Sequence, residues 1–361
     1  MAQMIARAMA KNPSGADKAL IDKLAAEFAD ELNNLGVRVA ALEKKVDNVK
    51  WKGELRFDFL KYRKEKNPRA NELHRSYYQL RLKPSMTINE HWTGRAGIYY
   101  GGIKDRETFA NAKNTDEFEM KWAYAEGVYG NTMIELGKLI LTTAVDEGMI
   151  YDEYMAGGRV TFGKDLKFAV TAGRVNNGHT VAVNYLGTSS YVGGELTYNK
   201  NNFSAGVGYH YFKDEKNWKA AYSDSTANIW EVGLGYKFGK DFRLSGAYAQ
   251  NTQGKSTKGD GTAIANSSAQ RRAYNIQLNY KGAQASKPGS WGLEAGYRHL
   301  GQFAALVPTY DYTFTDTKGW FVGGNVTLFK NVIGYVGYSN GKTISDNTKE
   351  NVIWGRFRFL F

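Results

Sequence analysis

Cysteine is absent from this sequence of 361 residues, and this absence excludes a disulfide framework and thiolate metal sites. No stretch approaches 18 consecutive apolar residues, so no transmembrane helix is predicted. Residues 1–11 lack the basic start, apolar run and small-residue cleavage site of a secretion signal. A protein that crosses an oxidising compartment without disulfides would need such a signal, and we therefore expect Met1 to be internal to a longer chain.

Catalytic and nucleotide-binding motifs are also missing. The five histidines show no metal-ligand spacing, and the glycine-rich segments do not match a dinucleotide or phosphate-binding loop. The formal charge of +12 invites a nucleic-acid interpretation, but the lysines and arginines are dispersed singly and do not form a patch or tail. We expect no enzyme activity, no cofactor, no metal and no nucleic-acid partner.

What the sequence does contain is an alternation of period two from Trp51 to the C-terminus. Trp51, Leu55 and Phe57 share one face of the first predicted strand, while Glu54 and Arg56 share the other. The apolar faces carry aromatic residues at their ends and small or aliphatic residues between them. Repetition of this pattern predicts sixteen strands.

The connections between the predicted strands alternate in length. Tight polar turns such as Gly130-Asn131 and Gly239-Lys240 alternate with long loops such as 141–154 and 300–317. Strands of about ten residues with short turns at one end and long loops at the other are typical of bacterial outer-membrane barrels. A soluble β-sandwich or propeller is the alternative, but the charged faces opposite the apolar ones suit a water-filled lumen better. An even strand number would put both ends of the barrel on the periplasmic side.

Residues 21–49 form a different pattern, in which apolar residues recur at alternating steps of four and three. This heptad repeat predicts a parallel coiled-coil stalk. Arg38 and Glu43 occupy g and e positions, where they can pair between chains, and their surroundings resemble a short signature of three-stranded coiled coils. β-Branched residues at a with leucine at d favour dimers, so the seam alone leaves the number of chains open. The predicted stalk residues are Ile21, Phe28, Leu32, Leu35, Arg38, Val39, Leu42, Glu43, Val46 and Val49.

Strand parity assigns charged residues to the lumen, although a β-bulge would reverse the assignment within a strand. The basic residues placed there are Arg56, Arg81, Lys83, Arg95, Lys121, Arg159, Lys167, Arg243, Arg271, Arg298, Arg356 and Arg358. The acidic residues placed there are Glu54, Asp58, Glu135, Glu195, Glu231 and Glu294. We expect most of these groups to solvate the lumen as mutual pairs.

The loop at 141–154, LTTAVDEGMIYDEY, follows the fifth predicted strand. Its position resembles that of the third loop of general porins, which folds inward and narrows the channel. In that arrangement Asp146, Glu147, Asp152 and Glu153 would form a pore constriction opposite basic wall residues. The alternative is an ordinary surface loop.

Four segments carry a resemblance to one family. Residues 1–11, MAQMIARAMAK, resemble the closing helix of an S-layer homology (SLH) module. The heptad seam, the direct passage from stalk to strand at 49–57, and the aromatic strand 354–361 complete the set. Phe361 also resembles the terminal signal read by the outer-membrane assembly machinery. The whole chain thus resembles the SLH-domain trimeric outer-membrane porins of diderm Firmicutes, with the SLH module mostly absent.

This resemblance implies passive diffusion of small hydrophilic solutes and tethering of the outer membrane to peptidoglycan through the absent module. It also implies a homotrimer, with outer-membrane lipid, lipopolysaccharide and the assembly machinery as further partners. Our prediction is an SLH-like remnant at 1–13, a periplasmic coiled-coil stalk at 14–50 and a sixteen-stranded antiparallel transmembrane β-barrel at 51–361. The predicted function is that of a general porin in the outer membrane. A sugar- or anion-selective channel and a mainly structural anchor are the alternatives.

Overall fold

The computed structural model describes residues 4, 16–28, 30–31, 48–65, 72–106, 115–176, 188–213, 225–253 and 261–361. The chain divides into two compact units, Met1–Lys50 and Trp51–Phe361. None of the helices within these described residues is both long enough and apolar enough to cross a lipid bilayer.

The first unit contains helix α2 (Ala16–Glu27) and the short strand β1 (Val49–Lys50). Asp17 lies in the first turn of α2, where its negative charge interacts favourably with the helix dipole and stabilises the helix. Ile21 lies within the helix and Phe28 just beyond its last residue. The structure differs from the predicted stalk at Val49, which is extended and not helical, as suits a β-branched residue where the chain passes into strands.

The other predicted stalk residues lie outside the described part of the chain. They are Leu32, Leu35, Arg38, Val39, Leu42, Glu43 and Val46. Of the predicted remnant at 1–13, only Met4 is described.

The second unit is built almost entirely of strands. They are β2 (Gly53–Lys64), β3 (Glu72–Leu82), β4 (Ser85–Thr87), β5 (Trp92–Arg106), β6 (Thr115–Tyr129), β7 (Thr132–Thr142), β8 (Asp152–Gly163), β9 (Leu166–Asn176), β10 (Thr188–Lys200), β11 (Phe203–Lys213), β12 (Thr226–Phe238), β13 (Phe242–Asn251), β14 (Arg272–Lys281), β15 (Trp291–Leu300), β16 (Thr317–Phe329), β17 (Val332–Thr343) and β18 (Lys349–Leu360), with the short helix α5 (Ser267–Gln270) before β14.

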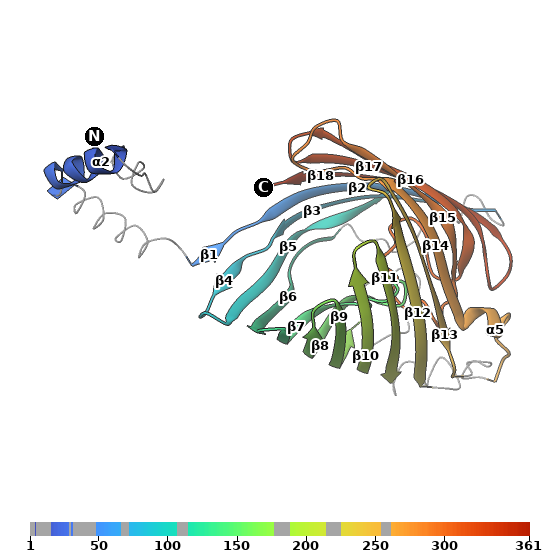
Figure 1. Ribbon diagram of the computed structural model, residues 1–361. Helices are drawn as coiled ribbons and strands as arrows, with labels where there is room; N and C mark the ends of the chain where they lie inside the picture. Colours follow the sequence, from blue (N-terminus) through green and yellow to red (C-terminus); the bar gives the residue numbers. More distant parts are fainter. Residues whose placement is uncertain are drawn as a thin grey trace. The chain divides into compact units, whose positions relative to one another are not determined.

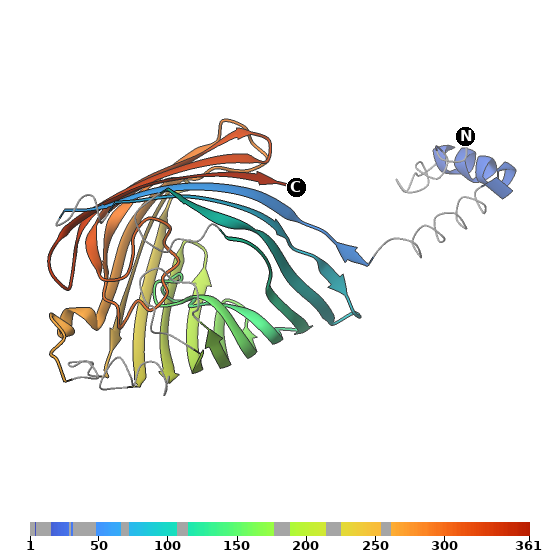
Figure 2. The same cartoon turned by 180° about the vertical axis from the view of Figure 1, so that it is seen from behind.

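These strands close into a barrel (Figures 1 and 2). Apart from β3 and β4, each pairs antiparallel with the next, and the last strand, β18, pairs with β2 through registers such as Phe357↔Phe57. Strands β3 and β4 both pair with β5 and are separated at Pro84, which cannot donate a ladder hydrogen bond. Counted as one interrupted strand, they make sixteen strands in the described chain. The predicted sixteen-stranded antiparallel barrel is therefore confirmed.

Tight turns lie at one end of the barrel and most of the long connections at the other. Gly130, Asn201 and Asn331 occupy such turns with φ of 60°, 55° and 66°. Glycine and asparagine tolerate this left-handed conformation better than other residues do. At the turn end, the chain terminus closes the ring, since the amide of Gly53 donates to the Phe361 carbonyl at 2.8 Å and the Phe361 amide donates back at 3.0 Å.

The outer face of the barrel is apolar and carries aromatic residues at two levels. On β12, Val232 and Leu234 are exposed between Trp230 near one end and Phe238 near the other. Eight residues of strand separate these two rings, about 26 Å along the strand or about 20 Å across a membrane at a tilt of ~40°. This matches the apolar band and aromatic girdles of outer-membrane barrels.

One strand departs from simple alternation. Between β5 and β6 the register shifts at Gly97/Ile98, so that Ile98 lies opposite Met120 while Gly97 lies opposite Trp122. The irregularity leaves Met120 exposed on the outer face and turns Trp122 inward, where it is only 7% exposed. Within β6, the residues that alternate with a period of two therefore pass from the outer face at Met120 to the inner face at Trp122.

Candidate functional site in the barrel interior

The inner face of the barrel carries paired charges. On β2, Leu55 and Phe57 are exposed outward, whereas Glu54 is buried and contacts three arginines. Arg56 and Arg81 each lie 3.2 Å from Glu54 Oε1, and Arg358 donates from Nε to Oε2 at 2.8 Å. Three guanidinium groups thus share one carboxylate, so this part of the wall keeps an excess of positive charge.

Arg356 extends the same wall. It donates to both oxygens of Asp58 at 2.7 and 2.6 Å and to both oxygens of Asp311 at 2.9 and 2.7 Å. Such bidentate pairs fix orientation as well as charge. We call Arg56, Arg81, Arg356 and Arg358 the arginine band. Its members come from β2, β3 and β18, which are neighbours in the sheet.

Residues 143–151, between β7 and β8, form inner loop A. The amides of Ala144 and Val145 donate to Glu195 on β10. Val145 packs over Gly206 and Gly233 on the wall. A Cβ added at Gly206 would lie 2.9 Å from Val145 Cγ2, and a Cβ added at Gly233 would lie 2.1 Å from the Val145 carbonyl oxygen. Glycine on the wall therefore makes room for the loop.

Asp146 organises inner loop A from within. Its Oδ1 accepts from the Thr143 hydroxyl at 2.6 Å and the Gly148 amide at 3.0 Å, and its Oδ2 accepts from the Ile150 amide at 2.7 Å. Burial, followed by the charge of Glu231, raises the pKa of Asp146 well above its usual range. The structure therefore differs from the expectation that Asp146 faces basic wall residues, because its carboxyl group holds the backbone of its own loop.

The other three acidic residues predicted for the constriction, Glu147, Asp152 and Glu153, have different surroundings. Glu147 forms an ion pair with Arg243 on β13, whose Nη1 also donates to Ser245 at 3.1 Å. Asp152 accepts from the Thr142 hydroxyl at the base of the loop. Glu153 is half-buried in β8. Of the four predicted residues, Glu147 is the one that forms an ion pair with a basic wall residue within the described part of the chain.

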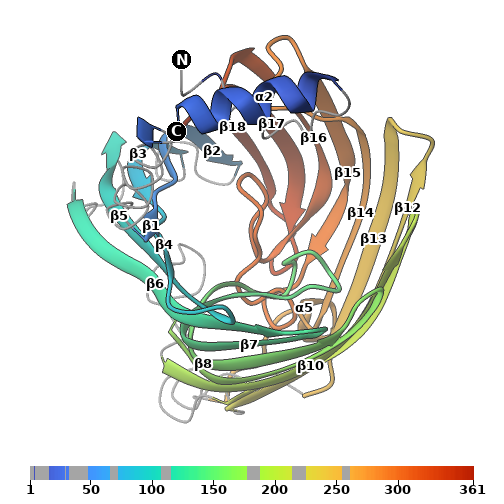
Figure 3. The same ribbon diagram turned by 60° about the vertical axis from the view of Figure 1, so that its left-hand side comes forward.

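A second connection also enters the barrel, and sequence reasoning missed it. Residues 301–316, between β15 and β16, form inner loop B, and Figure 3 shows both loops within the ring of strands. Tyr151 and Val307 form a parallel bridge between the loops. The Val307 amide donates to the Ile150 carbonyl at 3.0 Å, and the Thr309 amide donates to the Gly148 carbonyl at 2.9 Å.

Arg298 on β15 fastens inner loop B to the wall. Its guanidinium lies 3.6 Å from the ring centroids of both Tyr310 and Phe321 and donates to Thr313 at 2.8 Å. It also donates to Asn275 at 3.1 Å. Arg298 is only 4% exposed, so it supports the loop and is not a free charge of the lumen.

An apolar cluster fills the space beneath the two loops. Met149, Ile150 and Tyr151 from inner loop A pack with Leu306 and Val307 from inner loop B and with inward-facing strand residues. The apolar segment 303–307 is the signal in the sequence that could have indicated a buried course for inner loop B, because five consecutive apolar residues are unusual in a loop exposed to water.

The other predicted basic residues lie at several places along the wall. Arg95 pairs with Glu126 at 2.6 Å, and Arg159 pairs with Glu135 at 3.2 Å. Lys121 pairs with Glu119. The residues not yet placed are Lys83, just after β3, Lys167, near the start of β9, and Arg271, at the C-terminal end of α5.

The comparisons with known proteins agree with this architecture. Residues 222–351 match the family model described as "Putative porin". Salmonella typhi OmpF, solved in complex with daunomycin, is 15% identical with a TM-score of 0.56, covering 86% of this chain and 97% of OmpF. A triple mutant of the Rhodopseudomonas blastica porin is 12% identical with a TM-score of 0.51, covering 86% of this chain and 100% of that porin. No curated protein matches the sequence. The fold is that of porins.

Proposed function

We propose that this protein is a general diffusion porin of the bacterial outer membrane, passing small hydrophilic solutes through a narrow charged interior. The observation that carries the proposal is a closed barrel with an apolar outer face and a charged inner face. Such an outer face is stable in lipid, whereas such an inner face needs water or polar partners. The match to a porin family model and the likeness in fold to OmpF support the same function.

A narrow channel follows from the two inner loops. Inner loop A is bonded to Glu195 and Arg243 on β10 and β13, and inner loop B is bonded to Arg298 and Arg356 on β15 and β18. The loops therefore reduce the lumen from two sides. Solutes that pass must be small, and we propose that inner loop A forms one side of the constriction.

The charges that border the remaining space suit hydrophilic solutes. The arginine band lies on β2, β3 and β18, five to seven strands around the ring from β13, whose Arg243 holds Glu147. Guanidinium groups on one side and carboxylates on the other create a transverse field, which orients dipolar solutes and disfavours apolar ones.

Conductance of the purified protein in a planar lipid bilayer tests this function. We expect discrete channels with a linear current that no single sugar or anion saturates. Heat-dependent migration on denaturing gels would establish that the inserted protein is folded. A folded protein that carries no current would contradict a porin and favour a structural anchor.

A solute-selective channel is the second candidate, and inner loop B is the observation that favours it. A second inward loop adds contacts that a simple diffusion pore does not need, including Asp311 and Tyr310 within the barrel. Current that saturates as one solute is added, with a half-maximal concentration that competing solutes shift, would support selectivity over general diffusion.

We further propose that three copies associate through the N-terminal stalk in the periplasm, and that a longer parent protein tethers the outer membrane to peptidoglycan. The heptad seam at 21–49 and the resemblance to SLH-domain porins support this proposal. Chemical cross-linking of the detergent-solubilised protein should yield a trimer. A monomer that persists at every protein concentration would contradict the association.

A further inference from the structure

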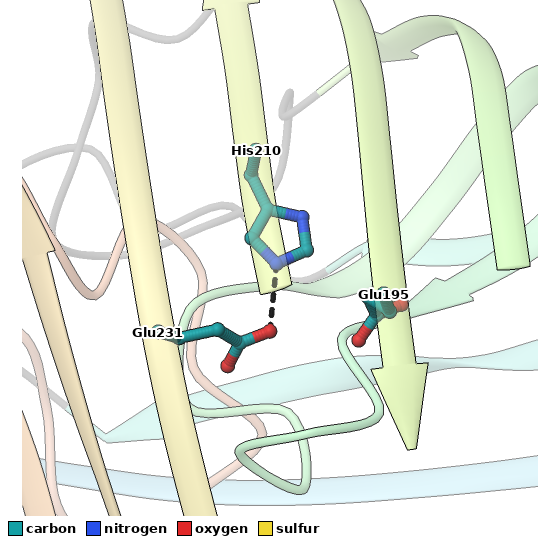
Figure 4. A group of neighbouring side chains, drawn as sticks. All are labelled: Glu195, His210 and Glu231. Atoms are coloured by element: carbon teal, nitrogen blue, oxygen red, sulfur yellow. Dashed lines mark hydrogen bonds and ion pairs between the residues drawn. The ribbon is translucent and has the colours of Figure 1, made fainter. Parts of the chain in front are cut away.

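Three side chains on adjacent strands converge beneath inner loop A: Glu195 on β10, His210 on β11 and Glu231 on β12 (Figure 4). One ligand atom from each lies within 4.8 Å of the other two. All three residues are buried, with exposures of 7%, 0% and 2%. We call them the buried triad.

The register of the sheet explains why these residues meet. Glu195 pairs with Gly208 on one side, and Gly208 pairs with Glu231 on the other. His210 lies two residues along β11 and faces inward as Gly208 does, while Val207 and Tyr209 face outward. A Cβ at Gly208 would lie 2.5 Å from Glu231 Oε1, so glycine leaves the space that the carboxylate occupies.

The imidazole of His210 is already oriented. Its Nδ1 lies 2.9 Å from the Tyr191 hydroxyl, and its Nε2 lies 2.7 Å from Glu231 Oε1. Tyr191 is itself only 1% exposed, so this contact is fixed by packing. A partner on one ring nitrogen that aims the other nitrogen into a site is the arrangement found around metal-ligating histidines.

The charge balance of the region calls for a cation. Glu195 and Glu231 bring two carboxyl groups together in one buried space, and His210 is the basic side chain between them. Among the described residues, no lysine or arginine forms an ion pair with either carboxyl group. The second oxygen of Glu231, Oε2, is buried and has no hydrogen-bond partner among the residues that the structure describes. Buried carboxylates normally pair with a cation or coordinate a metal.

We propose that the buried triad binds a divalent transition-metal ion of the Zn²⁺ type through His210 Nε2 and one carboxylate oxygen each from Glu195 and Glu231. Zinc bonds of ~2.0–2.2 Å in tetrahedral geometry set ligand atoms about 3.3–3.5 Å apart. His210 Nε2 and Glu231 Oε1 are closer than this, at 2.7 Å, and all three ligand atoms lie within 4.8 Å of one another, so small side-chain rotations suffice. The imidazole nitrogen and the small number of ligands favour such an ion over Ca²⁺ or Mg²⁺, which prefer six or more oxygens.

A metal at this position would also strengthen the attachment of inner loop A to the barrel wall. Glu195 accepts the amides of Ala144 and Val145 from the loop. Coordination of the same carboxylate would fix its orientation and therefore the tip of the loop. The inference does not depend on the proposed porin function, because metal binding is measured without any current through the barrel.

Calorimetric titration of the full chain with Zn²⁺ tests the inference, after metal is stripped by chelation in detergent. We expect one Zn²⁺ per chain, with Mg²⁺ giving no heat, and loss of binding in His210→Gln and Glu231→Gln. Tyr191→Phe should weaken binding by about 10- to 100-fold, since it removes the partner of Nδ1. Far-ultraviolet circular dichroism and heat-dependent gel migration would establish that each variant is folded.

His91→Gln is the matched control, because His91 lies 3.5 Å from Glu90 at an exposed site that could bind zinc adventitiously. Binding should survive this substitution. Zn²⁺ binding that is lost in His91→Gln but retained in folded His210→Gln would overturn the proposal. A wild-type protein that takes up no Zn²⁺ at up to about 100 µM would overturn it regardless of how the variants fold.

Discussion

Arg298 illustrates how a charge assigned to the lumen by strand parity can act as a structural residue. Its guanidinium is stacked between Tyr310 and Phe321 and donates to Thr313 in inner loop B. Arginine suits this position because its planar group stacks on rings while its edge donates hydrogen bonds. Lysine could supply the charge but not the planar stack.

We predict that Arg298→Met destabilises the seat of inner loop B by about 3 kcal/mol, the sum of a buried cation–π contact and charged hydrogen bonds. Limited proteolysis within residues 301–316 would measure the release of the loop. Arg272→Met is the control, because Arg272 is exposed and bonds to Ser268 alone among described side chains. Equal protease resistance in the wild type and Arg298→Met would contradict this role.

Asp146 gives inner loop A a dependence on pH. Its pKa is raised in the folded protein by burial, so between about pH 4 and the raised value the seated loop binds a proton that a released loop does not. The seat is therefore most stable at low pH and weakens as the pH rises through that interval. Hydrogen exchange of the Ala144 and Val145 amides, followed from acid to neutral pH in chelator, should show protection that decreases.

Asp146→Asn should flatten this profile, because the variant has no proton to lose at that position. Glu147→Gln, one residue further on and more exposed, should leave the profile unchanged apart from a shift in overall level. A profile that keeps its slope in Asp146→Asn would assign the pH dependence to another group.

Several residue placements were beyond the reach of the sequence. Trp122 alternates with Met120 as if both faced lipid, but the register shift between β5 and β6 turns it inward. A bulge depends on pairing with the neighbouring strand, which a single-strand pattern does not contain. His210 likewise lies 15 residues from Glu195 and 21 from Glu231, and only the register of three strands brings them together.

At the scale of elements, the two inner loops support each other. The parallel bridge between Tyr151 and Val307 and the hydrogen bonds beside it join connections that are far apart in the sequence. Each loop also has its own attachment to the wall, through Glu195 for inner loop A and Arg298 for inner loop B. Loss of either loop should therefore loosen the other.

We predict that replacing residues 302–314 with a short Gly-Ser linker raises single-channel conductance, and that replacing residues 144–150 does so too. Because the loops contact each other, the double replacement should depart from the sum of the single effects, as contacting elements generally do. Conductance in planar bilayers measures each variant. Unchanged conductance after removal of inner loop A would contradict its place at the constriction.

The inward course of one loop was predicted and that of the other was not. Inner loop A was identified by its place after the fifth strand and by its acidic residues. Inner loop B contains an apolar run at 303–307, which indicates that the segment is buried but does not say which surface it will cover.

At the scale of the whole molecule, the arginine band should influence which ions enter. Replacing Arg81 with Gln removes one positive charge while Glu54 keeps Arg56 and Arg358 as partners. At ~8 Å in water one charge contributes about 0.5 kcal/mol, or roughly a twofold change in the ion permeability ratio. The reversal potential in a salt gradient should shift toward cation selectivity. The same shift in Arg272→Gln, which lies in an exposed position, would show that distant charge is responsible.

The proposed stalk leads to a prediction about assembly. Replacing Arg38 and Glu43 together with Ala should weaken association of the full chain, because the heptad pattern assigns both residues to positions that pair between helices of a coiled coil. Native mass spectrometry at decreasing protein concentration would measure the loss of trimer. Lys23→Ala, at an outward heptad position, serves as the control. An unchanged trimer in the double variant would remove the proposed pairing.

The barrel as a whole was predictable because lipid and water impose opposite demands on alternate residues of every strand. Leu55 and Phe57 face outward and Glu54 faces inward, and this contrast recurs on strand after strand. Val49 shows the limit of this reasoning. It continues the heptad spacing of residues 21–49, although its backbone is extended. A residue between a helical pattern and a strand pattern fits both, and the sequence does not show which one it follows.

The hydrogen bonds between Gly53 and Phe361 have a topological consequence. Because the first and last strands of the barrel are neighbours, the sheet is a closed ring. Every strand in it has a partner on both sides, so the contacts do not distinguish a first strand from any other. A circularly permuted chain, opened at the Gly130-Asn131 turn and joined from Phe361 to Trp51, would contain the same strand pairs in the same registers. The order of the strands along the chain therefore decides which strand the N-terminal unit precedes, whereas the strand pairing of the ring does not depend on where the chain begins.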